Sequence, residues 1–293
     1  MNELTKKICL IFWPMVKLTI LVIVGLSFLH WLLFIVGNLP VREDVYLFFL
    51  PLAVPPVAVF FILRPRLKQL QFKQDKMLDF YCALFSIAMI APTMIAQNYI
   101  DKALGKLTTL EDITQVDKEP KSKYYTVNRY HLDTKKVGWY TEIKASGKSS
   151  YDLYFRAYAV FPIVKRYSDQ PTIDHTYWLG VSYQRNTGNP KNDLQLNMIY
   201  QRFIREVQHE FKGTNFRSFT FLEGLDKAKD RGKYAAALAN VGHTNVDEVL
   251  VFKPHVEHFD SRIQNHQLLW FFVSLGLAFA LCFALVFFAK LKK

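Results

Sequence analysis

The chain has 293 residues, about half of them apolar, and a formal net charge of +12. The apolar content is enough for one large folded unit or two modest ones, so core burial is not limiting. The apolar residues gather in four long runs, and this distribution excludes an ordinary soluble protein. The charge does not indicate specific nucleic-acid binding, because most of it lies in and beside these runs and residues 99–267 are only mildly basic.

Each of the four apolar runs predicts one transmembrane helix. A helix needs about 20 mainly apolar residues to cross about 30 Å of hydrocarbon, and each run reaches that length with few charges. The first run is too long for the hydrophobic part of a cleaved signal peptide and is expected to remain as an anchor. The predicted helices cover about residues 8–36, 45–63, 78–98 and 268–289.

Basic residues predict how these helices are oriented. Short loops rich in Lys and Arg stay on the cytoplasmic side, and the loop between the first two helices has only Arg42, followed by Glu43 and Asp44. The basic clusters therefore place both termini in the cytoplasm, with residues 99–267 on the other side and anionic lipid headgroups as neighbours of the clusters. The loop after the second helix contributes Arg64, Arg66, Lys68, Lys73 and Lys76, and the chain ends add Lys6, Lys7, Lys290, Lys292 and Lys293.

The positions of the three cysteines exclude cysteine-based sites from residues 99–267, the part expected outside the cytoplasm. Cys9, Cys82 and Cys282 all lie in or beside apolar runs, and residues 99–267 contain none. That part therefore has no disulfide framework, no thiolate zinc site and no cysteine nucleophile.

The first half of the exterior part is rich in strand signals. Residues 99–122 are expected to form a connector, in which Thr109 and the following carboxylates could cap one short helical turn. Tyr, Val, Ile, Phe and Thr then dominate four segments separated by Gly, Ser, Asp and Lys. In the third, alternation predicts one buried face, with Phe155 and Ala157, and one wet face, with Arg156 and Tyr158. The predicted strands are 123–131, 137–145, 151–164 and 176–185.

Helical periodicity appears in the second half. Residues 193–212 place apolar side chains three or four apart, which predicts an amphipathic helix opened by Asn192 or Asp193 and closed by Gly213. A strand over 216–223, a helix over 226–240 and a strand over 247–254 follow. The predicted class is an integral membrane protein with four transmembrane α-helices and an α+β domain between the third and fourth. Its domains are residues 1–98, the extracytoplasmic residues 99–267, and residues 268–293 with the fourth helix and a basic tail.

Candidate metal ligands are few. His255, Glu257 and His258 resemble an H-x-E sequence, but the zinc deaminase pattern also needs a Pro-Cys-x-x-Cys segment, which the sequence lacks. A solvated stalk near the membrane is the favoured alternative for these residues. The sequence also contains no glycine-rich phosphate loop, so no metal and no cofactor is predicted.

Polar and small residues in the apolar runs raise three further possibilities. Ser27 and His30 are three residues apart and could share one helix face, which an unusual intramembrane serine hydrolase would need. The sequence shows no oxyanion hole for such an enzyme. The alternative is that both side chains form hydrogen bonds to a neighbouring helix. The prolines of the second and third helices predict kinks that a transporter could use as gates. Small residues four apart in the fourth helix predict a stripe that packs within the bundle, with homodimerisation as the alternative. The prolines are Pro51, Pro55, Pro56 and Pro92, and the stripe is Gly276, Ala280 and Ala284.

Several short strings resemble the long N-terminal region that precedes the protease body in some bacterial rhomboid-family intramembrane serine proteases. The resemblance spans most of the chain, but Gly25-Leu26-Ser27-Phe28 and Gly147-Lys148-Ser149-Ser150 both lack the last glycine of the rhomboid G-x-S-G sequence. The chain also ends at Lys293, where a protease body would begin, so no catalytic residue carries over. The strings are LRPR at 63–66, Ala96-Gln97 with Tyr99, Gly105 to Thr108, Leu110 to Gln115, Lys123 to Thr126, Ser146 to Lys148, and Trp178 to Val181 with Tyr183.

The resemblance implies an accessory or regulatory membrane module. Together with the lack of a catalytic set, it predicts a non-catalytic protein of the bacterial inner membrane, with an exterior domain that binds or senses a ligand or an envelope protein. An intramembrane serine hydrolase using Ser27 and His30, or a transporter subunit, is the alternative.

Overall fold

The computed structural model describes residues 2–72, 74–146, 152–165, 176–188, 190, 192–243, 246–263 and 265–292. Lys73 and Lys293, Tyr151 of the third predicted strand, and residues 147–150 lie outside the described residues. The chain forms two compact units, which are treated separately. The helical unit contains Met1–Gly105 and Asp260–Lys293, and the sheet unit contains Lys106–Phe259.

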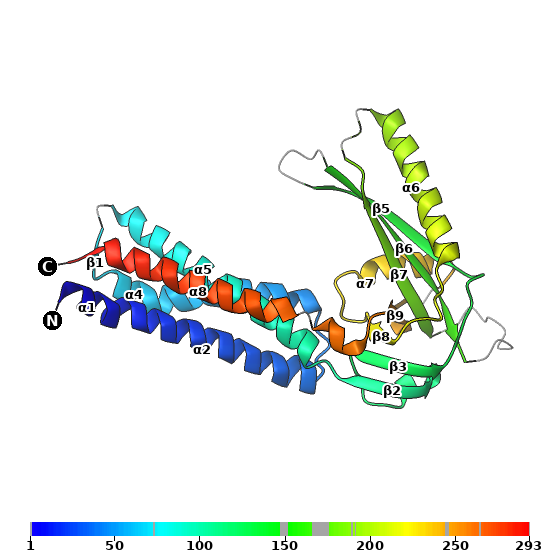
Figure 1. Ribbon diagram of the computed structural model, residues 1–293, viewed down its shortest axis with the longest axis horizontal. Coiled ribbons are helices and arrows are strands. Elements are labelled where there is room, and N and C mark those ends of the chain that lie inside the picture. Colours follow the sequence, from blue (N-terminus) through cyan, green and yellow to red (C-terminus); the bar gives the residue numbers. More distant parts are fainter. Residues whose placement is uncertain are drawn as a thin grey trace. The chain divides into compact units, whose positions relative to one another are not determined.

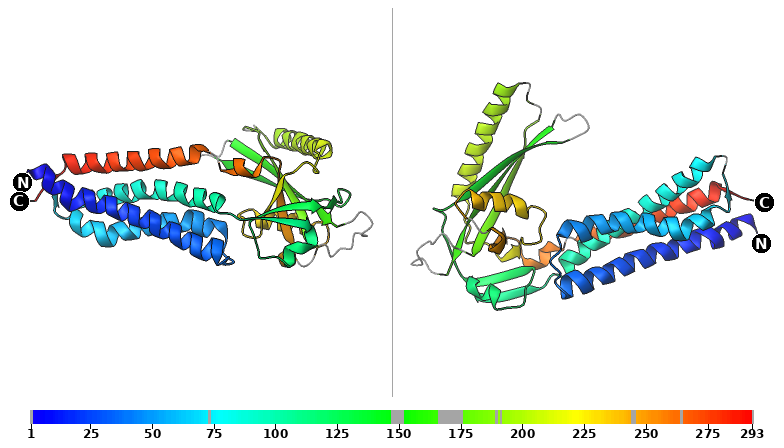
Figure 2. Two further views of the ribbon diagram at one scale, coloured as in Figure 1. Left: turned by 60° about the horizontal axis from the view of Figure 1, so that its bottom comes forward. Right: turned by 180° about the vertical axis from the view of Figure 1, so that it is seen from behind.

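Four helices in the described part of the chain are long and apolar enough to cross a membrane, as the sequence predicts. The first runs from Glu3 to Val36 and includes α1 (Glu3–Lys7) and α2 (Trp13–His30), with π-helical turns at Ile8–Phe12 and Trp31–Val36. The second consists of a π-helical turn at Val45–Phe49, α3 (Leu50–Ala58), another at Val59–Leu63, and α4 (Arg64–Leu67). The others are α5 (Asp75–Ala103) and α8 (Asn265–Phe288), preceded by a 3-10 turn at Phe259–Arg262, and Figures 1 and 2 show the helices running side by side.

The helical unit has a small core and an apolar outer surface. Met15, Leu63 and Phe85 are among the side chains buried between the helices. Large apolar side chains also point outward, and Phe61 and Phe288 are 71% and 80% exposed. Soluble monomers rarely expose so much contiguous apolar surface, whereas a helix bundle in hydrocarbon requires it.

Backbone pairing and the side chain of Lys7 join three chain segments at the end of the helical unit that holds both termini. The short strands β1 (Leu70–Gln71) and β10 (Lys290–Leu291) pair antiparallel. Lys7 Nζ donates hydrogen bonds to the carbonyls of Ala289 (2.7 Å) and Phe287 (3.3 Å), just beyond and within the last turn of α8. A cation there satisfies carbonyls that have no helical partner and complements the helix dipole.

Eight strands of the sheet unit, among its described residues, form one mixed sheet (Figure 1). The order is β2-β3-β8-β9-β7-β6, and β6 pairs on its other edge with both β4 and β5. The β2–β3 and β7–β9 pairs are parallel, and the other pairs are antiparallel. The strands are β2 (Leu107–Asp112), β3 (Tyr124–Arg129), β4 (His131–Leu132), β5 (Gly138–Ser146), β6 (Asp152–Val164), β7 (Tyr177–Asn186), β8 (Phe221–Gly224) and β9 (Leu250–His255).

Two helices cover opposite faces of this sheet. The amphipathic helix α6 (Asp193–Gly213) begins where the sequence predicts, since the Asn192 side chain accepts a hydrogen bond from Gln195 N at 2.8 Å. Its apolar side packs on Phe155 and Phe161 of β6. The shorter α7 (Arg231–Ala239) packs on the other face, against residues that include Tyr158.

The prediction of a wet face on β6 was wrong for Tyr158, which is buried, whereas Arg156 of the same face is half-buried. Phe155 and Ala157 enter the α6 core, while Tyr158 and Val160 enter the α7 core, so much of the strand is buried on both sides. Alternation reports the side on which a residue lies, but it does not show that a later helix will cover the polar-looking face.

Four further elements differ from the sequence prediction. The supposed connector contains β2 and a 3-10 turn at Ile113–Asp117, which Asp112 caps in place of Thr109. The strand predicted over 216–223 starts only at Phe221, and the helix predicted over 226–240 starts only at Arg231. The predicted strand 247–254 is preceded by a 3-10 turn at Val246–Glu248. These errors lie in short elements, which contain too few residues to show a clear periodic pattern.

The small-residue stripe of α8 does not form the packed face that the sequence predicts. Gly276 and Ala280 are exposed and Ala284 is half-buried, and among the described side chains of this helix the buried ones are Ala278, Cys282 and Val286. Two of these three are also small, and they lie on the face turned toward the other helices.

Candidate functional site

A polar cleft of about 550 Å³ opens where several strands of the sheet unit end. β2 ends at Asp112, which pairs in register with Arg129 at the end of the parallel strand β3. β4 begins at His131, opposite Val164 at the end of β6, and Lys165 follows directly. The lining residues are Asp112, Asn128, Arg129, Tyr130, His131 and Lys165.

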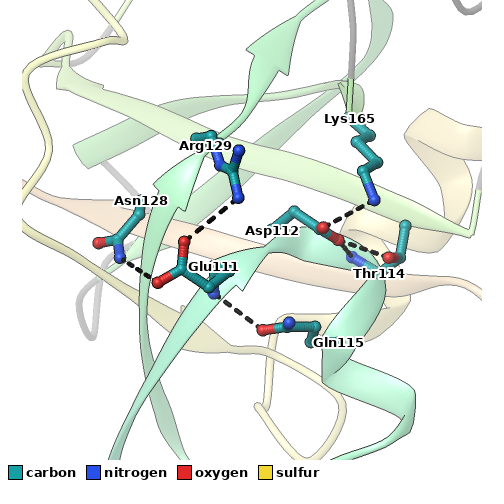
Figure 3. Close-up of polar contacts among 7 residues, drawn as sticks. All are labelled: Glu111, Asp112, Thr114, Gln115, Asn128, Arg129 and Lys165. Atoms are coloured by element: carbon teal, nitrogen blue, oxygen red, sulfur yellow. Dashed lines mark hydrogen bonds and ion pairs between the residues drawn. The ribbon is translucent and has the colours of Figure 1, made fainter.

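Asp112 is the most constrained side chain of this cleft. Its carboxylate accepts hydrogen bonds from both Thr114 N (3.0 Å) and Thr114 Oγ1 (2.5 Å), and it lies 2.8 Å from Lys165 Nζ (Figure 3). The Lys165 ammonium first, and the Thr114 donors after it, lower the pKa of Asp112 to about 2 from its ordinary value of 3.8. The carboxylate therefore stays ionised at any physiological pH and holds Lys165 at the cleft.

Replacing Asp112 by asparagine is expected to destabilise the protein at neutral pH, with a difference from wild type that shrinks in acid. Because the pKa is lowered in the folded state, the stabilisation is fully present above about pH 4 and is lost as the pH falls toward 2. Thermal unfolding of both proteins at pH 7, 4 and 2.5 measures the difference. A gap between them that is equally large at pH 2.5 would contradict this assignment.

Arg129 is the cation that a ligand can recruit most easily. Its side chain is 76% exposed, and Nη2 lies 3.4 Å from Glu111 Oε2. Asn128 Nδ2 also donates to Glu111, at 3.3 Å (Figure 3). An exposed ion pair of this kind contributes little, about 0–1 kcal/mol, so Arg129 can exchange Glu111 for another anion at small cost.

The aromatic side of the cleft is fixed by contacts outside it. The Tyr130 hydroxyl donates to Arg217 O at 3.1 Å, and its ring stacks on Phe219 with centroids 4.6 Å apart. Two basic side chains, an imidazole and a fixed carboxylate around one cleft suit a small polar ligand that carries a carboxylate or phosphate group.

The predicted metal candidates lie elsewhere in the sheet unit. His255 is the last residue of β9; its Nε2 lies 2.9 Å from Glu223 Oε2 of β8, and its ring stacks on Phe221. Burial raises the pKa of Glu223, but His255 and Lys123 outweigh this effect and lower it overall. His255 is therefore part of the sheet rather than of a stalk. Within the described part of the chain, no three His, Cys, Asp or Glu side chains come together as a possible metal site.

A second polar cluster is buried in the helical unit, between α2 and α5. His30, Gln97 and Asp101 are 2%, 1% and 6% exposed. His30 Nδ1 lies 2.8 Å from Gln97 Oε1, Gln97 Nε2 donates to Ser27 Oγ at 3.2 Å, and His30 Nε2 lies 3.6 Å from Asp101 Oδ1. We call these four residues the buried polar cluster.

The hydrogen bonds of the buried polar cluster connect the first long helix to α5. Because an amide oxygen can only accept, His30 Nδ1 must donate to Gln97. His30 Nε2 is buried and makes no hydrogen bond within the described part of the chain, and Asp101 Oδ1, at 3.6 Å, lies beyond hydrogen-bond distance.

This arrangement does not prepare Ser27 for nucleophilic attack. Activation needs the serine hydroxyl to donate to the imidazole, whereas here the Gln97 amide lies between them and donates to Ser27. The alternative, bonding of Ser27 and His30 to a neighbouring helix, is what the structure contains.

The sequence analysis missed Gln97 and Asp101 as members of a site. The signal was present, because Thr93, Gln97 and Asp101 recur every four residues and so share one face of α5. All three are buried. Asp101 fell in the supposed connector, which hid its place on the third long helix.

The basic residues expected to set the orientation lie around the ends of two helices. Arg64 Nη2 donates to Asp79 Oδ1 of α5 at 2.9 Å, and its guanidinium lies over the Phe60 ring. Arg66, Lys68 and Lys76 are exposed.

Comparisons of the chain with protein-family models, curated proteins and solved structures give no match.

Proposed function

We propose that the chain is a non-catalytic, multi-pass protein of the bacterial inner membrane whose sheet unit binds a small anionic ligand on the side opposite the termini. The cleft at Asp112, Arg129 and Lys165 carries this proposal. Its volume lies in the range of small-ligand sites, and its lining provides the charges that a carboxylate or phosphate needs. An accessory role related to rhomboid-type proteases remains a prediction from the sequence strings alone.

The proposal predicts that small anions bind the sheet unit and that Arg129 is needed for this. Succinate and inorganic phosphate are suitable probes, titrated into the purified full chain by calorimetry. Arg129→Gln is expected to weaken binding by about tenfold or more, since a hydrogen bond to a charged group contributes about 1.5–3 kcal/mol.

The matched control is Arg205→Gln, an exposed arginine of α6 outside the cleft, which is expected to bind as wild type does. Equal affinity of the Arg129→Gln variant and wild type, or no binding of either probe, would contradict the proposal.

The buried polar cluster supports a second candidate, a transporter subunit. Its α5 members, Gln97 and Asp101, follow Pro92, and buried ionisable residues inside a helix bundle are the kind of groups that proton-coupled transport uses. A proton flux through reconstituted vesicles that Asp101→Asn abolishes would favour this candidate over a purely binding role.

A further inference from the structure

A second cavity, of about 780 Å³, lies at the end of the helical unit that holds both termini. It is built from three segments that are far apart in the sequence: the start of the first helix, the loop after α4, and the tail after α8. Its lining consists of Glu3, Lys6, Leu10, Lys68, Gln69, Gln71, Lys290, Leu291 and Lys292.

Specific contacts hold these segments together. β1 and β10 pair Leu70 with Leu291 and Gln71 with Lys290, and Lys292 N donates to Gln69 O at 2.9 Å. The cavity is therefore a built feature of the fold and not a chance approach of three loose ends.

The charge of this cavity is strongly unbalanced. It contains four ammonium groups and one carboxylate, that of Glu3. Glu3 already has a partner in Lys7, at 3.3 Å. Among the described residues, no carboxylate lies within ion-pair distance of Lys6, Lys68 or Lys292. Clustered like charges repel one another unless an anion joins them.

The surroundings identify the kind of anion. The cavity lies at the ends of helices whose outer surfaces are apolar, and Leu10 adds an apolar wall to the basic lining. A free phosphate would use only the lysines, whereas a lipid would use both the lysines and the adjoining apolar surface. Basic pockets between the ends of membrane helices on the cytoplasmic side recognise anionic headgroups.

We propose that this cavity binds the phosphate headgroup of an anionic phospholipid, with Lys6, Lys68 and Lys292 as the main contacts. These three lysines, which the sequence predicts to set the orientation of the helices, thereby contribute to one site. This inference is independent of the ligand cleft in the sheet unit.

The test measures lipid binding to the purified full chain in detergent, which makes the result independent of how the chain inserts. Fluorescent phosphatidylglycerol is the probe, and phosphatidylcholine is the uncharged comparison. Wild type is expected to prefer phosphatidylglycerol, and the triple variant Lys6→Gln/Lys68→Gln/Lys292→Gln is expected to lose affinity by about tenfold or more, with weaker salt dependence. The corresponding triple Lys→Arg variant should retain binding, which separates loss of charge from loss of folding.

Lys76→Gln is the matched control, because Lys76 is an exposed lysine in the first turn of α5 that does not line the cavity. Unchanged binding in the triple Gln variant, or an equal loss in Lys76→Gln, would overturn the proposal. Competition by soluble glycerol phosphate as strong as that by the lipid would also overturn it, in favour of a free phosphate site.

Discussion

Replacing His30 by leucine is expected to destabilise the helical unit by about 1–3 kcal/mol, because it removes a buried hydrogen bond between two helices from one side. The substitution removes the imidazole that faces Asp101 and leaves the Gln97 carbonyl oxygen without its donor. Unfolding in mixed detergent micelles measures the change. The double variant His30→Leu/Gln97→Leu is expected to recover part of the loss, since it removes the acceptor that His30→Leu leaves without a donor.

Thr93→Val is the matched control on the same face of α5. Thr93 is also fully buried, but its hydroxyl donates to Met89 O of its own helix at 2.7 Å, so the substitution removes no contact between helices. Its cost is expected to stay below about 1 kcal/mol, within the range of one hydrogen bond. Equal effects of His30→Leu and Thr93→Val would show that the buried polar cluster does not join the helices.

Replacing Gly138 by alanine is expected to destabilise the sheet unit by about 1–3 kcal/mol or more through overpacking. Gly138 begins β5 beneath α7, and a Cβ there would lie 2.2 Å from the Ala237 carbonyl oxygen. Because the added Cβ would clash with a backbone atom and not with a flexible side chain, the clash can be removed only if α7 moves. Hydrogen exchange of full-chain protein, followed in peptides from β5, β6 and α7, measures the loss of protection.

Gly232→Ala makes the same chemical change, but it is expected to stabilise the sheet unit rather than destabilise it. Gly232 lies in α7 with no atom near the added Cβ, and alanine is favoured over glycine in a helix by about 1 kcal/mol. If Gly138→Ala stabilised the unit as Gly232→Ala does, the packing of α7 on β5 would be wrong.

The sequence predicts the long elements well because their signals extend over many residues. The four apolar runs correspond to the four long helices, and the periodic segment at 193–212 corresponds to α6. β2 escaped prediction because its neighbours are polar and its parallel partner β3 lies beyond a 3-10 turn. Pairing between strands is a tertiary property, and it overrides weak local preference.

The candidate sites were harder to predict, since each joins residues from distant segments. Asp112, Arg129 and Lys165 come together only through the register of β2 with β3 and of β4 with β6. Ser27 and His30 were identified as a pair, but Gln97, which lies between them, comes from another helix. Periodicity along one segment assigns a residue to a face, but it does not name the partner across that face.

The most direct test of this account is the placement of the sheet unit relative to the termini. Gln208→Cys in α6 and Asn2→Cys near the N-terminus provide single exposed thiols once Cys9, Cys82 and Cys282 are replaced by alanine. With a membrane-impermeant maleimide, Gln208→Cys is expected to react in intact spheroplasts and Asn2→Cys only after permeabilisation. Labelling of Asn2→Cys in intact spheroplasts, or protection of Gln208→Cys, would contradict four crossings with the sheet unit outside the cytoplasm.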